Sequence, residues 1–551
     1  MVFISRALMQ RITKLYHTVK MLRLKQIFYR LYYRFANVRP FCAQGFTRRP
    51  GVHLENAARW SASRFNADEQ FEFMGLTAPI DWHDETRPKI WQYNLHYLDH
   101  LASSDQTRTD FDKRLVNSWI ADNPPFSGCG WEPYTLSLRI VNLIKWLQQQ
   151  PNLEPHWLDS LATQAHALSE QVEYHILANH LFVNGKALVF AGSFLHGRQA
   201  DGWLAKGLKI LDEEIEEQFL ADGAHFELSP MYHASLLWDM CDLLNLATHS
   251  ELPELTTRQD KWRRLIERGM AWLRSLQHPD GGIPFFNDCA FGIAPTLLDI
   301  EAYAVELGCR AQDEMSDTSA IVVEHQAASG YVAINFGNQC KALLNLAQVA
   351  PDYQPGHTHA DTLSFELSLF GQRVFVNSGT SQYGEGAERH RQRSTAAHNT
   401  IEVNGESSSQ VWAGFRVARR ARTTVGKIEQ TADTVRISSS HDGYLRLAGK
   451  NVHTREWLAT SGQLQVMDSV SGAFDRAVSR LFLHPDVSAV QHGNTISITL
   501  PGGQVAVATL EGATRIHVAP STWHPEFGKS VPNQCIVADI STDRLTTCIT
   551  W

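Results

Sequence analysis

The stretch Thr362-Leu-Ser-Phe-Glu-Leu-Ser-Leu-Phe370 has the clearest secondary-structure pattern in this chain. Its apolar and polar residues alternate with a period of two, so the apolar residues share one face of an extended strand. A turn at Gly371 and a second apolar run, Val374-Phe-Val376, follow directly. Short strands separated by turn signals continue to Trp551. The sequence therefore predicts an antiparallel β domain of the sandwich type over residues 326–551.

The chain before this domain has a helical period instead. Apolar residues recur every 3.6 positions in three separate stretches, at 136, 140, 143, 144 and 147, at 161, 165, 168 and 172, and at 236, 240, 243 and 244. Several amphipathic helices joined by short polar links predict helices packed on helices over residues 85–325. Residues 1–84 form a basic helical leader and a lead-in segment. The change of period places the domain boundary near residue 325.

Length and composition exclude several classes of protein. The 551 residues are too many for one ordinary core, and 43% hydrophobic with 20% charged residues is typical of a globular chain. The formal net charge of −8 argues against a nucleic-acid partner. No apolar run is long enough to span a membrane. Eight scattered cysteines without a CxxC pair predict neither a disulfide framework nor a cysteine zinc site, and they fit a reducing, cytoplasmic compartment.

Charge is concentrated at the start of the chain. Residues 1–40 hold nine lysines and arginines and no aspartate or glutamate, and they lack the pattern of a cleaved signal peptide. Apolar positions such as Leu15, Ile27 and Leu31 define one side of a basic amphipathic helix. Two interpretations stay open: peripheral attachment to an anionic membrane surface, or a leading helix packed on the main domain.

Polar residues in apolar surroundings mark two candidate sites in the helical half. Asn179 and His180 interrupt an apolar stretch, where both are costly to bury unless they are hydrogen-bonded. Glu227, Tyr232 and His233 follow an irregular turn at the start of a helix, so Tyr232 is a candidate for a cleft-facing phenol. The alternative is a satisfied polar pair in the core and a tyrosine in ordinary packing.

Two further clusters lie in the β half. His357 and His359, at i and i+2 of an extended segment, face the same side, a spacing that suits two metal ligands or one ligand and one acid–base group. Tyr383 and a set of arginines that includes Arg389, Arg393 and Arg416 concentrate positive charge in an otherwise acidic chain. This set forms either a solvated sheet face or a binding wall for an anionic ligand, because guanidinium groups match carboxylates and sulfates.

The four clusters together resemble a known family. The ordered motifs are Asn179-His180, Asp222-Gly with Glu227-x-Ser-Pro-x-Tyr232-His233, His357-x-His359-Ala-Asp361, and His398-Asn399. They resemble the heparinase II/III family of polysaccharide lyases and are similar to alginate lyases of the same architecture. The resemblance covers about residues 90–480. It implies a multidomain α+β fold, an α/α toroid (an incomplete helical barrel) followed by an antiparallel β-sandwich.

The resemblance also implies an activity. Such lyases cleave a uronic-acid polysaccharide by β-elimination, removing the C5 proton and breaking the C4–O bond. Asn179 and His180 would stabilise the charge that develops on the sugar carboxylate, with His180 also a candidate base. Tyr232 would donate a proton to the leaving oxygen, and on some substrates act as base, while His357 is the opposing base. The implied substrate contacts are Asn94, His96, Tyr134, Glu227, His233, Tyr383, Arg389, Arg393 and Arg416.

The same resemblance implies a divalent metal, usually zinc, with ligands at 359, 377 and 398. Here Asn377 replaces the family's aspartate, so with His359 and His398 it predicts a weakened or empty site. The expected partner is an acidic polysaccharide that is heparin-like, another glycosaminoglycan or alginate-like. One alternative is a non-catalytic protein that binds acidic polysaccharide in exopolysaccharide or lipopolysaccharide assembly. Another is a toroid glycoside hydrolase using two carboxylates from Glu173, Asp222 and Glu227.

Overall fold

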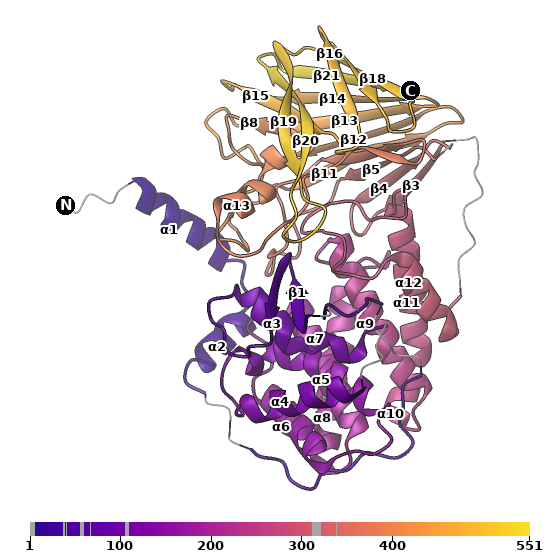
Figure 1. Ribbon diagram of the computed structural model, residues 1–551. Helices are drawn as coiled ribbons and strands as arrows, with labels where there is room; N and C mark the ends of the chain where they lie inside the picture. The colour runs from indigo at the N-terminus through magenta and orange to yellow at the C-terminus, as the bar shows by residue number, and fades with distance from the viewer. Residues whose placement is uncertain are drawn as a thin grey trace, which may run out of the picture.

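The computed structural model describes residues 6–36, 39, 41–55, 60–66, 68–104, 109–310, 321–337 and 339–551. A helical body and a β body are stacked on each other, with the N-terminal helices α1 (Arg6–Val19) and α2 (Leu24–Tyr32) on one flank (Figure 1). Among the described residues, no helix combines the length and apolar character that crossing a bilayer requires. The fold is an α/α toroid followed by an antiparallel sandwich, as predicted.

The toroid consists of helices that pack through the predicted apolar faces. Its helices are α3 (Lys89–Tyr97), α4 (Thr109–Asp122), α5 (Pro133–Leu147), α6 (Pro155–Glu170), α7 (Ala178–Phe194), α8 (Arg198–Gln218), α9 (Pro230–Thr248), α10 (Pro253–Thr256), α11 (Gln259–Leu276) and α12 (Leu297–Glu306). In α5 the whole predicted stripe is buried, and in α6 and α9 the predicted positions are buried too. Proline occupies the first helical position of α5, α6 and α9, where its missing N–H costs nothing.

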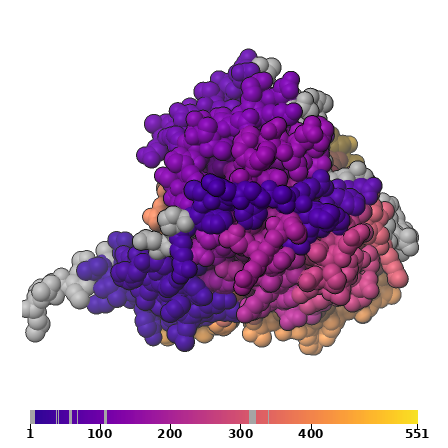
Figure 2. All heavy atoms as spheres, turned by 90° about the horizontal axis from the view of Figure 1, so that it is seen from below, coloured from indigo at the N-terminus to yellow at the C-terminus, as the bar shows by residue number. Residues whose placement is uncertain are grey.

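An extended segment ties the outer ends of these helices together. Residues 41–55 cross the toroid as a band, seen in Figure 2 from below. Within it, the Ala43 and Phe46 N–H groups donate to Thr163 and Asp159 of α6 at 3.1 and 3.0 Å. The hairpin of β1 (Gln70–Phe73) and β2 (Leu76–Pro79) follows and packs its buried side on the toroid core. The predicted lead-in segment is therefore part of the toroid's surface.

The β body contains three main antiparallel sheets. Eight strands form the order β11-β12-β13-β14-β21-β18-β17-β16, four form β19-β20-β15-β8, and five form β3-β4-β5-β6-β7. The strands are β3 (Val322–Gln326), β4 (Tyr331–Asn335), β5 (Lys341–Asn345), β6 (Phe365–Leu369), β7 (Gln372–Phe375), β8 (Ile401–Val403), β11 (Thr423–Gln430), β12 (Val435–His441), β13 (His453–Thr460), β14 (Gln463–Val470), β15 (Ala477–Phe482), β16 (Ser488–His492), β17 (Thr495–Thr499), β18 (Val505–Glu511), β19 (Arg515–Trp523), β20 (Val531–Ile540) and β21 (Arg544–Thr550). A short hairpin, β9 (Val411–Trp412) and β10 (Arg416–Val417), and helix α13 (Ala387–Arg393) lie beside them. The first strand begins at Val322, three residues before the predicted boundary.

Strand β6 differs from its predicted environment in one respect. The alternating pattern predicts one buried and one polar face, but all five residues of β6 are buried. The polar face packs on the toroid, where Glu366 and Ser368 contact the two ring nitrogens of His278 at 2.9 and 2.8 Å. Burial raises the pKa of Glu366 to about 7. The polar side of this strand therefore forms part of the seam between the two domains.

Candidate functional site

The predicted catalytic side chains meet at the junction of the two domains. The toroid supplies Asn179 and His180 from α7 and Tyr232 from α9, and the sandwich supplies His357 from the loop before β6. The Tyr232 and His357 rings are adjacent, with centroids 3.9 Å apart and planes tilted by 32°. Glu227 lies between Asn179 and His357. Its carboxylate accepts the Asn179 N–H at 3.4 Å and lies 3.6 Å from His357 Nε2. Residues about 180 positions apart in sequence thus meet at one site between the two domains.

The backbone conformation at the start of α7 and of α9 places Asn179, His180 and Tyr232 at this site. Leu177 and Ala178 both have positive φ, at 68° and 54°, immediately before Asn179. Non-glycine residues in this conformation are strained by about 1–3 kcal/mol each and concentrate at functional sites. Asn179 and His180 therefore lie in the first turn of α7 rather than in a helix interior. In α9 the Ser229 side chain accepts the Tyr232 N–H, which fixes Tyr232 in the first turn.

His180 is held by a buried carboxylate. Its Nδ1 lies 3.0 Å from Glu173 Oε1, and the second oxygen of Glu173 accepts the amide of Asn184 at 3.1 Å. The His180 ring is 30% exposed and stacks on Tyr134 at 4.4 Å. Burial alone lowers the pKa of His180, but the charge and hydrogen bond of Glu173 raise it above its usual value. The raised pKa favours the protonated form of His180, which suits carboxylate binding better than action as a base.

Tyr232 is held as a neutral phenol. Its hydroxyl lies 2.8 Å from the Tyr383 hydroxyl, on the sandwich side of the cleft. Burial, together with Tyr383 and Asp288, raises the pKa of Tyr232 well above its usual value. Ionisation of this hydroxyl in the resting site is disfavoured, so the geometry suits proton donation by Tyr232. Tyr383 is the neighbour that orients the donor.

A buried aspartate, Asp288, which is not among the predicted site residues, contacts the histidines of the sandwich side. Asp288, in the loop between α11 and α12, lies 3.0 Å from His357 Nδ1 and 2.8 Å from His359 Nε2. Arg389 approaches both of its oxygens, one of them at 2.7 Å. Burial opposes its ionisation, but Arg389 holds the pKa of Asp288 well below its usual range. A hydrogen bond from Nδ1 to this carboxylate leaves Nε2 of His357 as the proton acceptor.

Two predicted arginine contacts are wrong. Arg389 and Arg393 were expected to line a wall for an anionic ligand, but both are 1% exposed. Arg389 donates hydrogen bonds to the Asp288 carboxylate. Arg393 donates to the carbonyl oxygens of Thr358 at 2.9 Å and Gly414 at 2.7 Å. These guanidinium groups hold loops in place because buried carbonyl and carboxylate oxygens need donors. Arg416 is exposed on β10 and lies over the ring of Trp412.

Two predicted histidine contacts are also wrong. His96 is buried in the toroid, with its ring nitrogens 3.0 Å from Trp119 Nε1 and 3.2 Å from the Trp82 carbonyl oxygen. His233 is fully buried and bonds the His225 N–H and the Gly269 carbonyl oxygen. Burial lowers the pKa of His96 to about 3 and that of His233 to about 4. Both are satisfied core histidines.

Other predicted contacts have different surroundings. The Asn94 side chain donates to the Ile90 carbonyl oxygen of its own helix at 2.8 Å, with no bond to the catalytic group. Tyr134 contacts the His180 ring, and the Tyr383 hydroxyl contacts the Tyr232 hydroxyl, so both tyrosines lie at the site. Glu227 is 2% exposed, and burial raises its pKa.

The site offers two of the three donors expected for a metal. His359 and His398 each use Nε2 in a bond to protein oxygen, Asp288 and the Gln392 carbonyl respectively, and each has a buried Nδ1 without a partner. This is the arrangement in which a histidine binds metal through its other nitrogen. Asn377 does not fit: its Oδ1 accepts the Asn399 N–H at 3.2 Å, and the amide adds no negative charge. Across the described ranges, no group of three histidine, cysteine or acidic side chains forms a metal cluster.

The carboxylates considered for glycoside hydrolysis do not form a pair across the cleft. Glu173 is bound to His180 and Asn184, whereas Asp222 accepts the Ser329 and Ala224 N–H groups at 2.8 and 3.2 Å. Glu227 lies 3.6 Å from His357 Nε2. Hydrolysis requires two carboxyl groups flanking the bond, and this arrangement does not provide them.

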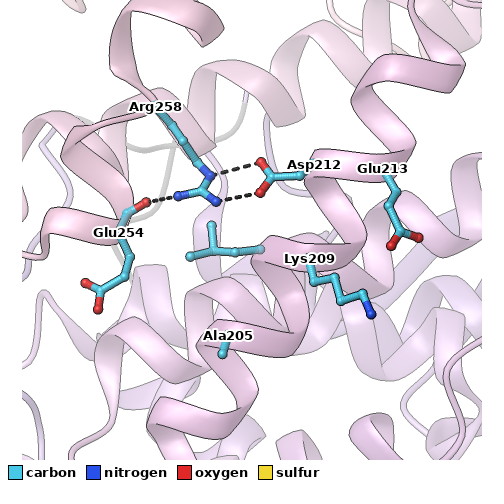
Figure 3. Close-up of a pocket in the computed structure, with 7 residues that line it drawn as sticks. Ala205, Lys209, Asp212, Glu213, Glu254 and Arg258 are labelled. Atoms are coloured by element: carbon cyan, nitrogen blue, oxygen red, sulfur yellow. Dashed lines mark hydrogen bonds and ion pairs between the residues drawn. The ribbon is translucent and has the colours of Figure 1, made fainter.

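A hollow lies on the outer helices, away from the predicted site residues (Figure 3). It is lined by Ala205, Leu208, Lys209, Asp212, Glu213, Glu254 and Arg258. Its arginine is bound by both oxygens of Asp212, at 3.0 and 2.5 Å. None of the predicted site residues lines this hollow.

Comparison with known proteins identifies the family. Residues 47–299 match the model "Heparinase II/III N-terminus", and residues 323–551 match "Heparinase II/III-like, C-terminal". The chain belongs to the heparinase II/III family. Within this family it is similar to the heparin-sulfate lyase of Bacteroides thetaiotaomicron, at 26% identity over 68% of this chain and 57% of that one. It is also similar to the heparin-sulfate lyase of Bacteroides stercoris, at 24% identity over 63% of this chain and 52% of that one.

Solved structures support the family fold. Heparinase III matches with a TM-score of 0.71 at 19% identity, covering 94% of this chain and 88% of that one. A heparan sulfate lyase from Pedobacter heparinus matches with a TM-score of 0.58 at 17% identity, covering 95% and 87%. This family member spans just over half the length of the curated relatives that it matches.

Proposed function

We propose that this chain is a polysaccharide lyase that cleaves a uronic-acid-containing glycosaminoglycan by β-elimination. The observation that carries the proposal is the junction of the two domains, where the neutral Tyr232 phenol and the His357 imidazole lie with ring centroids 3.9 Å apart, near Asn179 and near His180, whose pKa is raised. The names of the curated relatives, heparin-sulfate lyases, make heparan-type polymers the first substrates to test. The non-catalytic binding role has no observation in its favour.

The proposed reaction begins with the sugar carboxylate. Asn179 and protonated His180 hydrogen-bond this group, and their donors stabilise the negative charge that grows on it when the C5 proton leaves. His357 Nε2 takes that proton, and the imidazolium formed is stabilised by Asp288 at Nδ1. This step requires the C5–H bond to face His357, on the sandwich side of the cleft.

The second half of the reaction breaks the C4–O4 bond. Its electrons leave with O4, a C4=C5 double bond forms, and Tyr232 donates its hydroxyl proton to O4. The hydrogen bond to Tyr383 orients that hydroxyl. The proton held by His357 then returns to the Tyr232 phenolate, and both groups are ready for another turnover.

The test is a panel of heparan-type, chondroitin-type, hyaluronan and alginate polymers, followed by ultraviolet absorbance and product mass spectrometry. Elimination gives an unsaturated sugar that absorbs light and is one water lighter than a hydrolysed end. We expect Tyr232→Phe and His357→Gln to lose the absorbance change. Saturated products, or full activity in Tyr232→Phe, would contradict the proposal.

Two finer predictions accompany this function. We propose at most a weak zinc site at His359 and His398, because Asn377 adds no anionic oxygen. No step of the reaction above uses this metal. The cytoplasmic location expected from the sequence stays a prediction, which fractionation of cells followed by immunodetection can test.

A further inference from the structure

Helix α1 is oriented with its apolar side outward. Met9, Ile12, Leu15, Tyr16 and Val19 fall within an arc of roughly 120° on a helical wheel. All five are exposed, by 43–64%. An ordinary surface helix buries such a stripe, so this orientation leaves the apolar face of α1 in contact with water.

The polar side of α1 makes the contacts with the protein instead. Thr18 Oγ1 accepts from Trp412 Nε1 at 3.1 Å, and Arg419 Nε lies 3.2 Å from His17 Nε2. These partners belong to the β9–β10 hairpin and the segment after it. The helix is therefore fixed to the sandwich by polar bonds, and packing of its apolar stripe plays no part in this attachment.

Helix α2 repeats the arrangement on the toroid. Buried Gln26 donates to the Tyr353 carbonyl oxygen at 3.3 Å, and Tyr33, just after the helix, donates to the Val172 carbonyl oxygen at 2.5 Å. The opposite side carries an exposed stripe that continues past the helix: Leu24 (84%), Ile27 (37%), Phe28 (61%), Leu31 (56%), Tyr32 (50%) and Phe35 (83%). Figure 2 shows the indigo N-terminal residues as one lobe at the flank of the molecule.

The charged residues of the segment that carries both stripes have one sign. Residues 6–36 contain eight lysines and arginines and no acidic residue. Arg23 is paired with Glu217, and Lys25 lies over the Tyr174 ring. Arg11, Arg30 and Arg34 take part in none of the ion pairs found in the part of the chain that the structure describes. An apolar, aromatic stripe bordered by cations matches the boundary of an anionic bilayer.

We propose that α1 and α2 form a membrane-binding face that lies on anionic lipid, with their apolar stripes inserted at the headgroup boundary. This proposal is independent of the lyase activity. A sulfated polysaccharide would satisfy the cations, but it could not cover eleven exposed apolar side chains. A second copy of the chain would bring two sets of like charges together, which is unfavourable. Lipid satisfies both features at once.

The test uses the full chain and vesicle sedimentation. Wild-type protein is expected to sediment with vesicles of equal parts phosphatidylglycerol and phosphatidylcholine, and to stay in solution with phosphatidylcholine alone. Neutralising three cations, in the triple variant Arg11→Gln, Arg30→Gln, Arg34→Gln, should lower the partition coefficient on the order of 100-fold, because each is worth a few-fold near such a surface.

A second triple variant removes the apolar contribution. Ile12→Gln, Phe28→Gln, Leu31→Gln should abolish sedimentation with the anionic vesicles. The matched control is Leu298→Gln with Val490→Gln, which changes residues 74% and 55% exposed on α12 and β16 and should sediment like wild type. All substitutions lie at exposed positions outside the cleft. Thermal unfolding and turnover of free polysaccharide should therefore match wild type, which separates failure here from failure of the lyase assignment.

Four results would overturn the proposal. They are no sedimentation of the wild type, equal sedimentation with neutral vesicles, unchanged sedimentation of the apolar variant, or a dimer in light scattering that the apolar variant converts to monomer. The last result would assign the stripes to a second copy. Loss of retention on immobilised heparin with unchanged vesicle binding in the cation variant would assign the cations to polysaccharide.

Discussion

Replacement of Glu173 by glutamine tests how His180 works. Glu173 contacts His180 Nδ1 at 3.0 Å, and its charge is the largest influence that raises the histidine's pKa against burial. Glutamine keeps the size and a hydrogen-bonding group but removes the charge. Burial is then opposed by the smaller influence of Glu227, so the pKa of His180 should fall from above its usual 6.5 to below it.

The expected effect depends on pH. A raised pKa keeps His180 protonated at low pH, and this contribution is lost as the pH rises through that pKa. In the variant the loss should occur at lower pH. Once His180 is neutral, one charged donor to the developing carboxylate dianion is missing, and loss of such a donor costs about 10²–10³-fold in kcat. The deficit should therefore be small at pH values below both pKa values, largest around pH 6.5, between the two, and smaller again once wild-type His180 is also neutral.

The assay measures kcat for Glu173→Gln and wild type on the same polymer across this range. The ratio of the two values at each pH cancels the titration of every group that the substitution leaves unchanged. Glu170→Gln, at an exposed position three residues earlier, is the matched control and should give a ratio near one throughout. A ratio that is flat with pH, or that has no minimum around pH 6.5, would refute the reasoning and leave Glu173 with a purely structural role.

Three further outcomes are expected. Tyr383→Phe should lower kcat about tenfold with little change in KM, as measured by initial rates, because only the hydrogen bond orienting the Tyr232 donor is lost. Asp288→Asn should lower the free energy of unfolding by about 3–5 kcal/mol in urea titrations, since it leaves the buried Arg389 charge without its partner. The control is Asp260→Asn, which removes the exposed partner of Arg263 and should lower the free energy of unfolding by less than about 1 kcal/mol. Asn377→Asp should raise zinc content, measured by elemental mass spectrometry after dialysis against zinc, and an unchanged content would exclude a site there.

Periodicity predicted the fold because the apolar faces of these helices and strands are local features. The stripe from Leu136 to Leu147 is the buried side of α5, and the run around Phe365 is β6. The burial of Glu366 could not be predicted in this way. It depends on His278, 88 positions away, which covers the face of the strand that would otherwise be solvated.

The candidate site was predictable where motifs named its residues, and less so where partners lie far apart. The sequence places Arg389 among several other arginines, and this cluster predicts a contact with an anionic substrate. Its actual partner, Asp288, lies 101 positions earlier in an irregular loop, so the pairing has no local signal. The only local signal for Asp288 was an acidic residue within the apolar run Phe285-Phe286-Asn287-Asp288-Cys289. His96 and His233 show the converse: a histidine near a motif is indistinguishable in sequence from one satisfied in the core.

The placement of Asp288 also constrains how this architecture can be recombined. The aspartate belongs to the helical half, yet the three charged or ionisable groups that it holds, His357, His359 and Arg389, all belong to the β half. A chimera that joined this toroid to the sandwich of a relative would have to keep these contacts. Without them, the Asp288 carboxylate would be buried without a partner of opposite charge. Neither half is thus an exchangeable module, and the loop bearing Asp288 has to be inherited together with its recipients.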